Sequence, residues 1–133
     1  MQSDGVNADI ELRDVDIPSP GPGQLLVRVR AAGLNRGEFI LSHGLHKAGT
    51  AKQIGMEAAG EVVSCGAGAE GFKPGDRVMG RCPGAFAEYA LMSVPETMHM
   101  PASLNWNQAA GLPLTSLVVF DMLVVQGNLK AGE

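Results

Sequence analysis

Glycine and proline divide this chain into short segments, which favours a fold built from short strands and tight turns. The sequence contains 18 glycines and 8 prolines, and turn signals recur at a spacing of roughly 8–12 residues, which suits a β-barrel. Near the N-terminus, Pro18, Pro20 and Pro22 fix φ and remove backbone donors, while Gly21 and Gly23 permit sharp reversals. The segment predicts a turn through which no regular element can continue.

Polarity alternates directly after this turn, over residues 24–32. Such alternation is typical of a half-buried strand, with one apolar and one polar face. The two faces are expected to carry Val27, Val29 and Ala31 on one side and Arg28 and Arg30 on the other. A polar loop over residues 33–38 is expected to end the strand.

Later apolar runs, bounded by turn residues, predict further strands. These cover Gly60–Cys65, Arg77–Met79 and Ala85–Val94. Between the first two, Pro74 and Gly75 occupy the central positions of a type II turn. In the last strand, Phe86 and Tyr89 are expected to pack the interior of a barrel.

Helices are predicted only in the last third of the chain. Asn105 and Gln108 have the spacing of a capping box, and Pro113 suits the first turn of a second helix. Gly127 stands where that helix should end. Apolar residues surround most of the helix between Leu114 and Val125, so we expect it to be buried. Its apolar run of about 14 residues is shorter than the roughly 20 that cross a membrane, so no membrane association is predicted.

Composition indicates one compact domain. The 133 residues are 45% hydrophobic and 18% charged, and a chain of this length can bury roughly two-thirds of its unfolded surface. The net charge of −4, with one Trp and one Tyr, argues against nucleic-acid binding. The polar N-terminus does not have the pattern of a signal sequence, which predicts a cytoplasmic location. In that compartment Cys65 and Cys82 are expected to be reduced.

Five segments, taken in order, resemble one protein superfamily. They are Pro18–Glu38, Gly55–Val63, Phe72–Val78, Gly84–Tyr89 and Ala109–Leu117. Their order is similar to that in the N-terminal half of the medium-chain dehydrogenase/reductase superfamily, within its zinc-free quinone oxidoreductase branch. The resemblance implies a mainly β fold, a GroES-like partly open β-barrel with C-terminal helices. It divides the chain into a catalytic barrel over residues 1–104 and a helical segment over 105–133 that leads to a nucleotide-binding domain.

Zinc-dependent alcohol dehydrogenases, the sister branch, have a metal-binding cysteine where this chain has Asn35 and a metal-binding histidine where it has Met56. Amide oxygens and thioethers are poor zinc ligands, so the resemblance implies chemistry without zinc. His43 and His46 have an i, i+3 spacing. Because no third ligand stands at a matching spacing, two surface histidines are favoured over a metal site.

The expected cofactor domain has no counterpart in the chain. A phosphate loop of the G-x-G-x-x-G type should lie between a strand and a helix, with an acidic residue about 20 positions further on, and no segment fits that context. The resemblance places a strand before this region and a Rossmann domain after it. The chain is therefore expected to be cut at both ends and inactive without its other half.

The resemblance implies hydride transfer from NADPH to a small quinone or enone. The nicotinamide supplies the redox chemistry, and hydrogen-bond donors can stabilise developing negative charge on the acceptor oxygen. Asn35 stands at the family position beside the nicotinamide and is the candidate catalytic residue, orienting the cofactor or the acceptor carbonyl. Thr115 is the second candidate contact to the cofactor. An asparagine capping its own loop and an ordinary helix-start threonine remain the alternatives.

Three charged residues in the matched segments carry further expectations. Glu57 is expected to be buried, to need a partner such as an arginine, and to be structural rather than catalytic. Arg36 and Glu38 flank the Asn35 loop and are expected to form a solvated surface pair.

Two other interpretations compete with that of a reductase domain. In the first, the chain is a stand-alone GroES-like module that binds a partner, or assembles with copies of itself through the apolar helix. In the second, it is a degenerate alcohol dehydrogenase, and Asn35 and Met56 argue against this interpretation.

Overall fold

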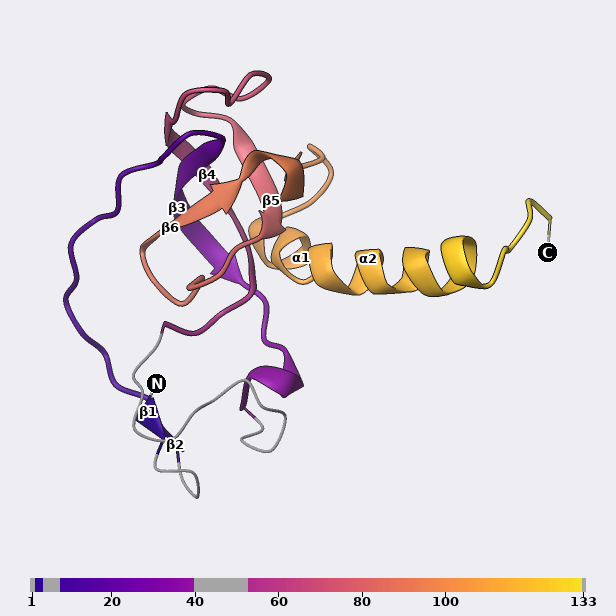
Figure 1. Ribbon diagram of the computed structural model, residues 1–133, viewed down its shortest axis with the longest axis horizontal. Coiled ribbons are helices and arrows are strands. Elements are labelled where there is room, and N and C mark those ends of the chain that lie inside the picture. Colours follow the sequence, from indigo (N-terminus) through magenta and orange to yellow (C-terminus); the bar gives the residue numbers. More distant parts are fainter. Residues whose placement is uncertain (1, 4–7, 40–52, 133) are drawn as a thin grey trace.

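A five-stranded antiparallel sheet forms the centre of the computed structural model, which describes residues 2–3, 8–39 and 53–132 (Figure 1). The strand order is β6-β3-β4-β5-β7. Its strands are β3 (Gln24–Ala32), β4 (Glu57–Cys65), β5 (Arg77–Arg81), β6 (Tyr89–Ser93) and β7 (Thr97–His99). The short strands β1 (Gln2–Ser3) and β2 (Ala8–Asp9) pair with each other. The sheet curves into a half-barrel, so the expected mainly β fold is confirmed.

Helical segments are short until the C-terminal part of the chain. They are the 3-10 turns η1 (Arg36–Phe39) and η3 (Val94–Glu96), helices α1 (Trp106–Ala110) and α2 (Pro113–Phe120), and the π-helical turn η4 (Asp121–Gln126). The capping box of Asn105 and Gln108 is confirmed at the start of α1. Pro113 opens α2 as predicted, and Gly127 ends the helix with φ −80°, followed by Asn128 at φ 53°.

The predicted strand over residues 24–32 is confirmed, but its simple alternation is wrong. The register of β3 against β4 shifts between Val29 and Ala31, as at a β-bulge. Val29 therefore packs against the core cluster that contains Leu25 and Val27, whereas Ala31 packs against the opposite cluster, with Ala59 and Met79. A bulge moves every later side chain to the other face, which polarity alone does not reveal.

Other strand predictions differ at their boundaries. Strand β4 begins three residues earlier than predicted, and β6 begins only at Tyr89, after bends at residues 86–88. Phe86 and Tyr89 are only half-buried and belong to neither core cluster, so the prediction that they pack the interior is wrong. The type II turn before β5 is supported by Gly75 at φ 90° and a hydrogen bond from Asp76 N to Lys73 O of 3.1 Å.

Both faces of the sheet are packed. The larger cluster consists of Leu25, Val27, Ala58, Val62, Ala69, Val78, Cys82, Ala85, Ala90 and Met92. Helix α1 covers the other face through Ala109 and Ala110. Arg77 ties this helix to the sheet, since its guanidinium lies 4.4 Å from the centre of the Trp106 ring, a cation–π distance.

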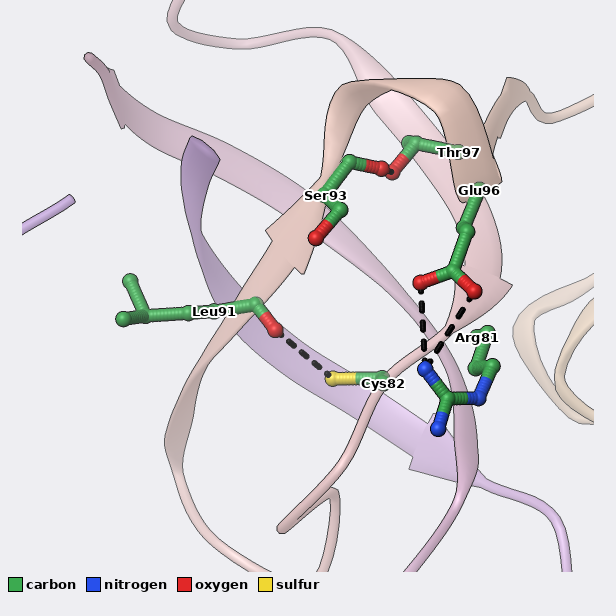
Figure 2. A network of polar contacts seen from close by, with 6 residues as sticks. All are labelled: Arg81, Cys82, Leu91, Ser93, Glu96 and Thr97. Atoms are coloured by element: carbon green, nitrogen blue, oxygen red, sulfur yellow. Dashed lines mark hydrogen bonds and ion pairs between the residues drawn. The ribbon is translucent and has the colours of Figure 1, made fainter. Parts of the chain in front are cut away.

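The connection from β6 through η3 to β7 is held by polar contacts (Figure 2). Arg81 of β5 pairs with Glu96 of η3 at 3.2 Å, and Thr97 Oγ1 donates to Ser93 O at 2.8 Å. The Arg81–Glu96 pair is well exposed to water, so it positions the connection rather than adding much stability.

Both cysteines are free, in agreement with the sequence prediction. The side chain of Cys82 lies in the larger core cluster, with its sulfur 3.9 Å from Leu91 O (Figure 2). Burial raises the pKa of the Cys82 thiol from 9.0 to about 12.

Iodoacetamide at pH 8 should therefore alkylate Cys82 about 1000-fold more slowly in the folded than in the unfolded chain, because about three pKa units separate the thiolate populations. The pKa of Cys82 is higher in the folded than in the unfolded chain. The contribution of the protonated thiol to folding stability is therefore complete below pH 9 and is lost as the pH rises towards 12. Mass spectrometry of each modified cysteine measures the rates. Equal rates for Cys82 in folded and urea-unfolded protein would contradict its burial.

Helix α2 is not buried, contrary to the prediction. It leads away from the sheet together with η4 (Figure 1). Leu117, Val118, Phe120 and Met122 are each 55–61% exposed, and Val125 is 63% exposed. Apolar residues on all sides of a helix are typical of a buried helix, but no described segment of the chain covers this one. None of the described helices is long and apolar enough to cross a membrane.

Candidate functional site

An open, mainly apolar pocket lies where the end of β3, the start of β4 and helix α2 meet. Its volume is about 430 Å³. It is lined by Asn35, Gly37, Glu38, Met56, Leu114, Thr115, Val118 and Val119. Both predicted site residues, 80 positions apart in sequence, therefore line one pocket, together with Met56.

The backbone explains how these side chains meet. Asn35 lies three positions after the end of β3, and its carbonyl accepts from Glu38 N at 3.0 Å, which begins η1. Met56 precedes β4, and its carbonyl accepts from Cys82 N at 2.8 Å. Thr115 lies in the first turn of α2 and is exposed towards the pocket.

Glu57, the first residue of β4, joins these parts from behind the pocket. Its side chain is 2% exposed. Oε1 accepts from Asn35 Nδ2 at 3.0 Å, and Oε2 accepts from Leu114 N at 2.9 Å. The expected arginine partner is thus wrong: a side-chain amide and a backbone N–H at the start of α2 satisfy the carboxylate, and the positive end of the helix dipole favours its charge.

Gly33 makes room for this carboxylate. A Cβ at position 33 would lie 2.4 Å from Glu57 Oε1, far inside van der Waals contact. The backbone of Gly33 also donates to the carbonyl of Glu57 at 3.1 Å. Any larger residue would therefore push Glu57 away from Asn35.

Arg36 and Glu38 do not form the expected surface pair. Arg36 is exposed, but Glu38 is only 5% exposed, and its Oε2 accepts from Gly55 N at 2.9 Å. The sequence did not reveal this role because the partner of Glu38, the backbone N–H of Gly55, lies 17 positions away. Glu38 ties η1 to the segment that carries Met56.

Asn35 and Met56 both line the pocket, and an amide and a thioether are not ligands that zinc prefers. Within residues 2–3, 8–39 and 53–132, no group of three or more His, Cys, Asp or Glu side chains is placed to hold a metal. His43 and His46 lie outside the described residues. His99 is at the end of β7, where it stacks on Phe72 at 4.7 Å and bonds Gly71 O.

One glycine-rich string has the spacing of a phosphate loop. Residues 66–71 read G-A-G-A-E-G and follow a strand. In the structure they belong to the connection between the antiparallel strands β4 and β5, with turns in place of a helix. A phosphate loop needs the N-terminus of a helix, so the string is a hairpin connection and no dinucleotide site.

The pocket combines apolar walls with three polar side chains, those of Asn35, Glu38 and Thr115. Met56, Val118 and Val119 offer a surface for a flat ring, and the Thr115 hydroxyl can donate or accept. Nδ2 of Asn35 is bonded to Glu57, whereas its Oδ1 accepts no hydrogen bond from the residues that the structure describes. The sequence predicted that Val118 and Val119 lie in a buried helix and did not predict that they line a pocket.

A curved antiparallel sheet with a pocket between its end and a following helix defines this chain as a GroES-like domain. Residues 21–102 match the alcohol dehydrogenase GroES-like domain. The chain belongs to that family, within the medium-chain dehydrogenase/reductase superfamily.

Known relatives agree with this assignment. The chain is 37% identical over 119 residues to the synaptic vesicle membrane protein VAT-1 homolog of Mus musculus, covering 87% of this chain and 29% of the relative. It is 35% identical over 127 residues to a quinone oxidoreductase of Pseudomonas aeruginosa, covering 93% and 39%. A mycobacterial protein solved in complex with NADPH superimposes with a TM-score of 0.80 at 28% identity, covering 91% and 38%. The chain thus spans well under half the length of each.

Proposed function

We propose that this chain is the N-terminal catalytic domain of a zinc-independent, NAD(P)H-dependent quinone or enone oxidoreductase. It contributes the acceptor side of the active site, and the phosphate-binding part belongs to a Rossmann half. In this proposal the chain consists of a catalytic barrel over residues 1–104 and a helical segment over 105–133. Without the Rossmann half it is expected to be inactive. The observation that carries this proposal is the single pocket shared by Asn35, Thr115 and Met56.

The pocket fits a nicotinamide ring beside a small acceptor. Its volume of about 430 Å³ and its apolar walls suit flat rings, and its polar groups are few. When bound, NADPH would supply the hydride. Asn35 Oδ1 and the Thr115 hydroxyl would orient the two rings, while Val118 and Val119 would offer an apolar surface on one side. The Thr115 hydroxyl can also donate to the acceptor oxygen as negative charge develops there.

Absence of zinc is part of the proposal and rests on the donor chemistry of Asn35 and Met56. The cytoplasmic location and the exclusion of nucleic acid and membrane partners remain predictions from composition and the N-terminal sequence.

Binding of a quinone tests the acceptor side directly. Titrating the ¹⁵N-labelled chain with tetramethyl-1,4-benzoquinone, which resists addition of thiols, should shift the amide signals of the pocket residues. Thr115→Val keeps the shape of the side chain but removes the donor, so it should weaken binding about fivefold. Ser116→Ala, at an exposed neighbour outside the pocket lining, is the matched control and should bind as the wild type does. Equal affinities of wild type and Thr115→Val would contradict the role of the hydroxyl.

A stand-alone assembly module is the second candidate function. The exposed apolar surface of α2 and η4 favours it, because a free-standing domain needs a partner for such a surface. In this case the chain should form a discrete homo-oligomer through the helix. An enzyme domain deprived of its other half should instead associate without a defined end point.

A further inference from the structure

We propose that Glu57 is a positioning residue that fixes the orientation of the Asn35 side-chain amide and thereby selects ligand groups that donate a hydrogen bond. This inference rests on the proposed function, because it assumes that the pocket of Asn35 and Thr115 receives the nicotinamide. It adds a reason why one side of the pocket should prefer a carboxamide, which has an N–H donor, to a ketone, which has none.

The first step is the chemistry of the pair. An ionised carboxylate has no donor, so the group that faces Glu57 Oε1 at 3.0 Å must be the NH₂ of Asn35. With the amide turned over, two oxygens would face each other in a site where Glu57 is 2% exposed. The buried carboxylate thus determines which end of the amide is Nδ2 and which is Oδ1.

The second step is what remains for a ligand. Leu114 N is the first backbone donor of α2, since Pro113 precedes it, and it is bonded to Glu57 Oε2 at 2.9 Å. Asn35 Oδ1 has no partner among the described residues, and Asn35 lines the pocket. The acceptor Oδ1 therefore suits an N–H or O–H of a ligand, such as the carboxamide of nicotinamide.

The third step is the effect of changing one atom. In Glu57→Gln, the side-chain oxygen can still accept from Leu114 N, and the new NH₂ then faces Asn35. Asn35 must turn its amide over to accept from it, which sends Nδ2 towards the pocket. The number of hydrogen bonds is preserved, but the polarity offered to the ligand is reversed.

Two probes that share a ring distinguish these states. Nicotinamide carries an N–H donor, whereas 3-acetylpyridine has a methyl ketone that only accepts. Wild-type chain, followed by NMR titration, should bind nicotinamide about fivefold more tightly than 3-acetylpyridine. Glu57→Gln should bring this ratio close to one, because Asn35 then offers a donor and the carbonyl oxygens of both probes can accept from it. A ratio that stays the same in folded Glu57→Gln would overturn the proposal.

Matched variants separate positioning from general damage. Glu61→Gln makes the same change on the same strand, at a side chain 43% exposed that pairs with Arg30, and should leave the ratio unchanged. Should Glu57→Gln fail to fold, Asn35→Asp combined with Glu57→Gln provides a donor at position 57 and an acceptor at position 35 without any amide having to turn over. That double variant should fold and offer only an acceptor at position 35, which again favours nicotinamide; preference for 3-acetylpyridine would count against the proposal.

Failure of the proposed function gives a different result. If neither probe binds the wild type, the pocket is not a nicotinamide site, yet the amide orientation is still measurable from the Asn35 side-chain NH₂ signals. Hydrogen-bonded to Glu57, these protons should exchange slowly with water, and in Glu57→Gln they should exchange fast. Identical exchange in both proteins would refute the positioning role.

Discussion

Leu25→Ala should lower the free energy of unfolding by about 2–5 kcal/mol, the largest loss that we expect from a single truncation in this chain. Leu25 is fully buried in β3. Its strand lies between β4 and β6, where Leu25 pairs with Cys65 on one side and Met92 on the other. Truncation leaves a cavity that the paired strands cannot close without breaking register.

Urea denaturation followed by circular dichroism measures this loss. Leu12→Ala removes the same atoms from a side chain that is 97% exposed, and it should change stability by less than about 0.5 kcal/mol. A loss below about 1 kcal/mol for Leu25→Ala would show that the centre of the sheet is not packed as described.

The second large effect concerns self-association through the exposed helix. We expect the chain to associate as its concentration rises, and Phe120→Gln combined with Val125→Lys to weaken this association about 100-fold. The two side chains are 57% and 63% exposed, so their replacement removes little packing within one chain.

Sedimentation velocity over a range of concentrations measures this association. Leu12→Lys introduces charge at an exposed apolar residue outside the helix and should not alter it. A discrete oligomer that the double variant disrupts would favour the assembly module, and open-ended association would favour an enzyme domain without its other half. A wild-type chain that stays monomeric throughout would contradict both expectations.

Local sequence patterns predicted the elements whose signals are local. The capping box at Asn105, the turn around Gly75 and the centre of β3 were all visible in the sequence because each depends on neighbours within a few positions. The bulge after Val29 was not, because a register shift depends on the partner strand. Exposure of α2 was mispredicted for a related reason: apolar composition shows that a helix suits burial but not which segment covers it.

The candidate site was predicted in part. Resemblance to a family, and not periodicity, placed Asn35 and Thr115 on the same pocket. Burial of Glu57 followed from its apolar neighbours, but its partners did not, because they are 22 and 57 positions away in the sequence. Glu38 was misjudged on the same ground, since its bond to Gly55 spans 17 positions.

The two bonds of Glu57 also say when during folding the site can form. Each bond closes a loop, one of 22 and one of 57 positions. The chain entropy lost on closing each loop opposes the formation of the bond. A chain emerging from the ribosome can therefore pair β3 with β4 while Glu57 still has no N–H from Leu114. The pocket is completed only when α2 has been synthesised, so a segment 57 positions later in the chain sets the geometry of the Glu57 side chain.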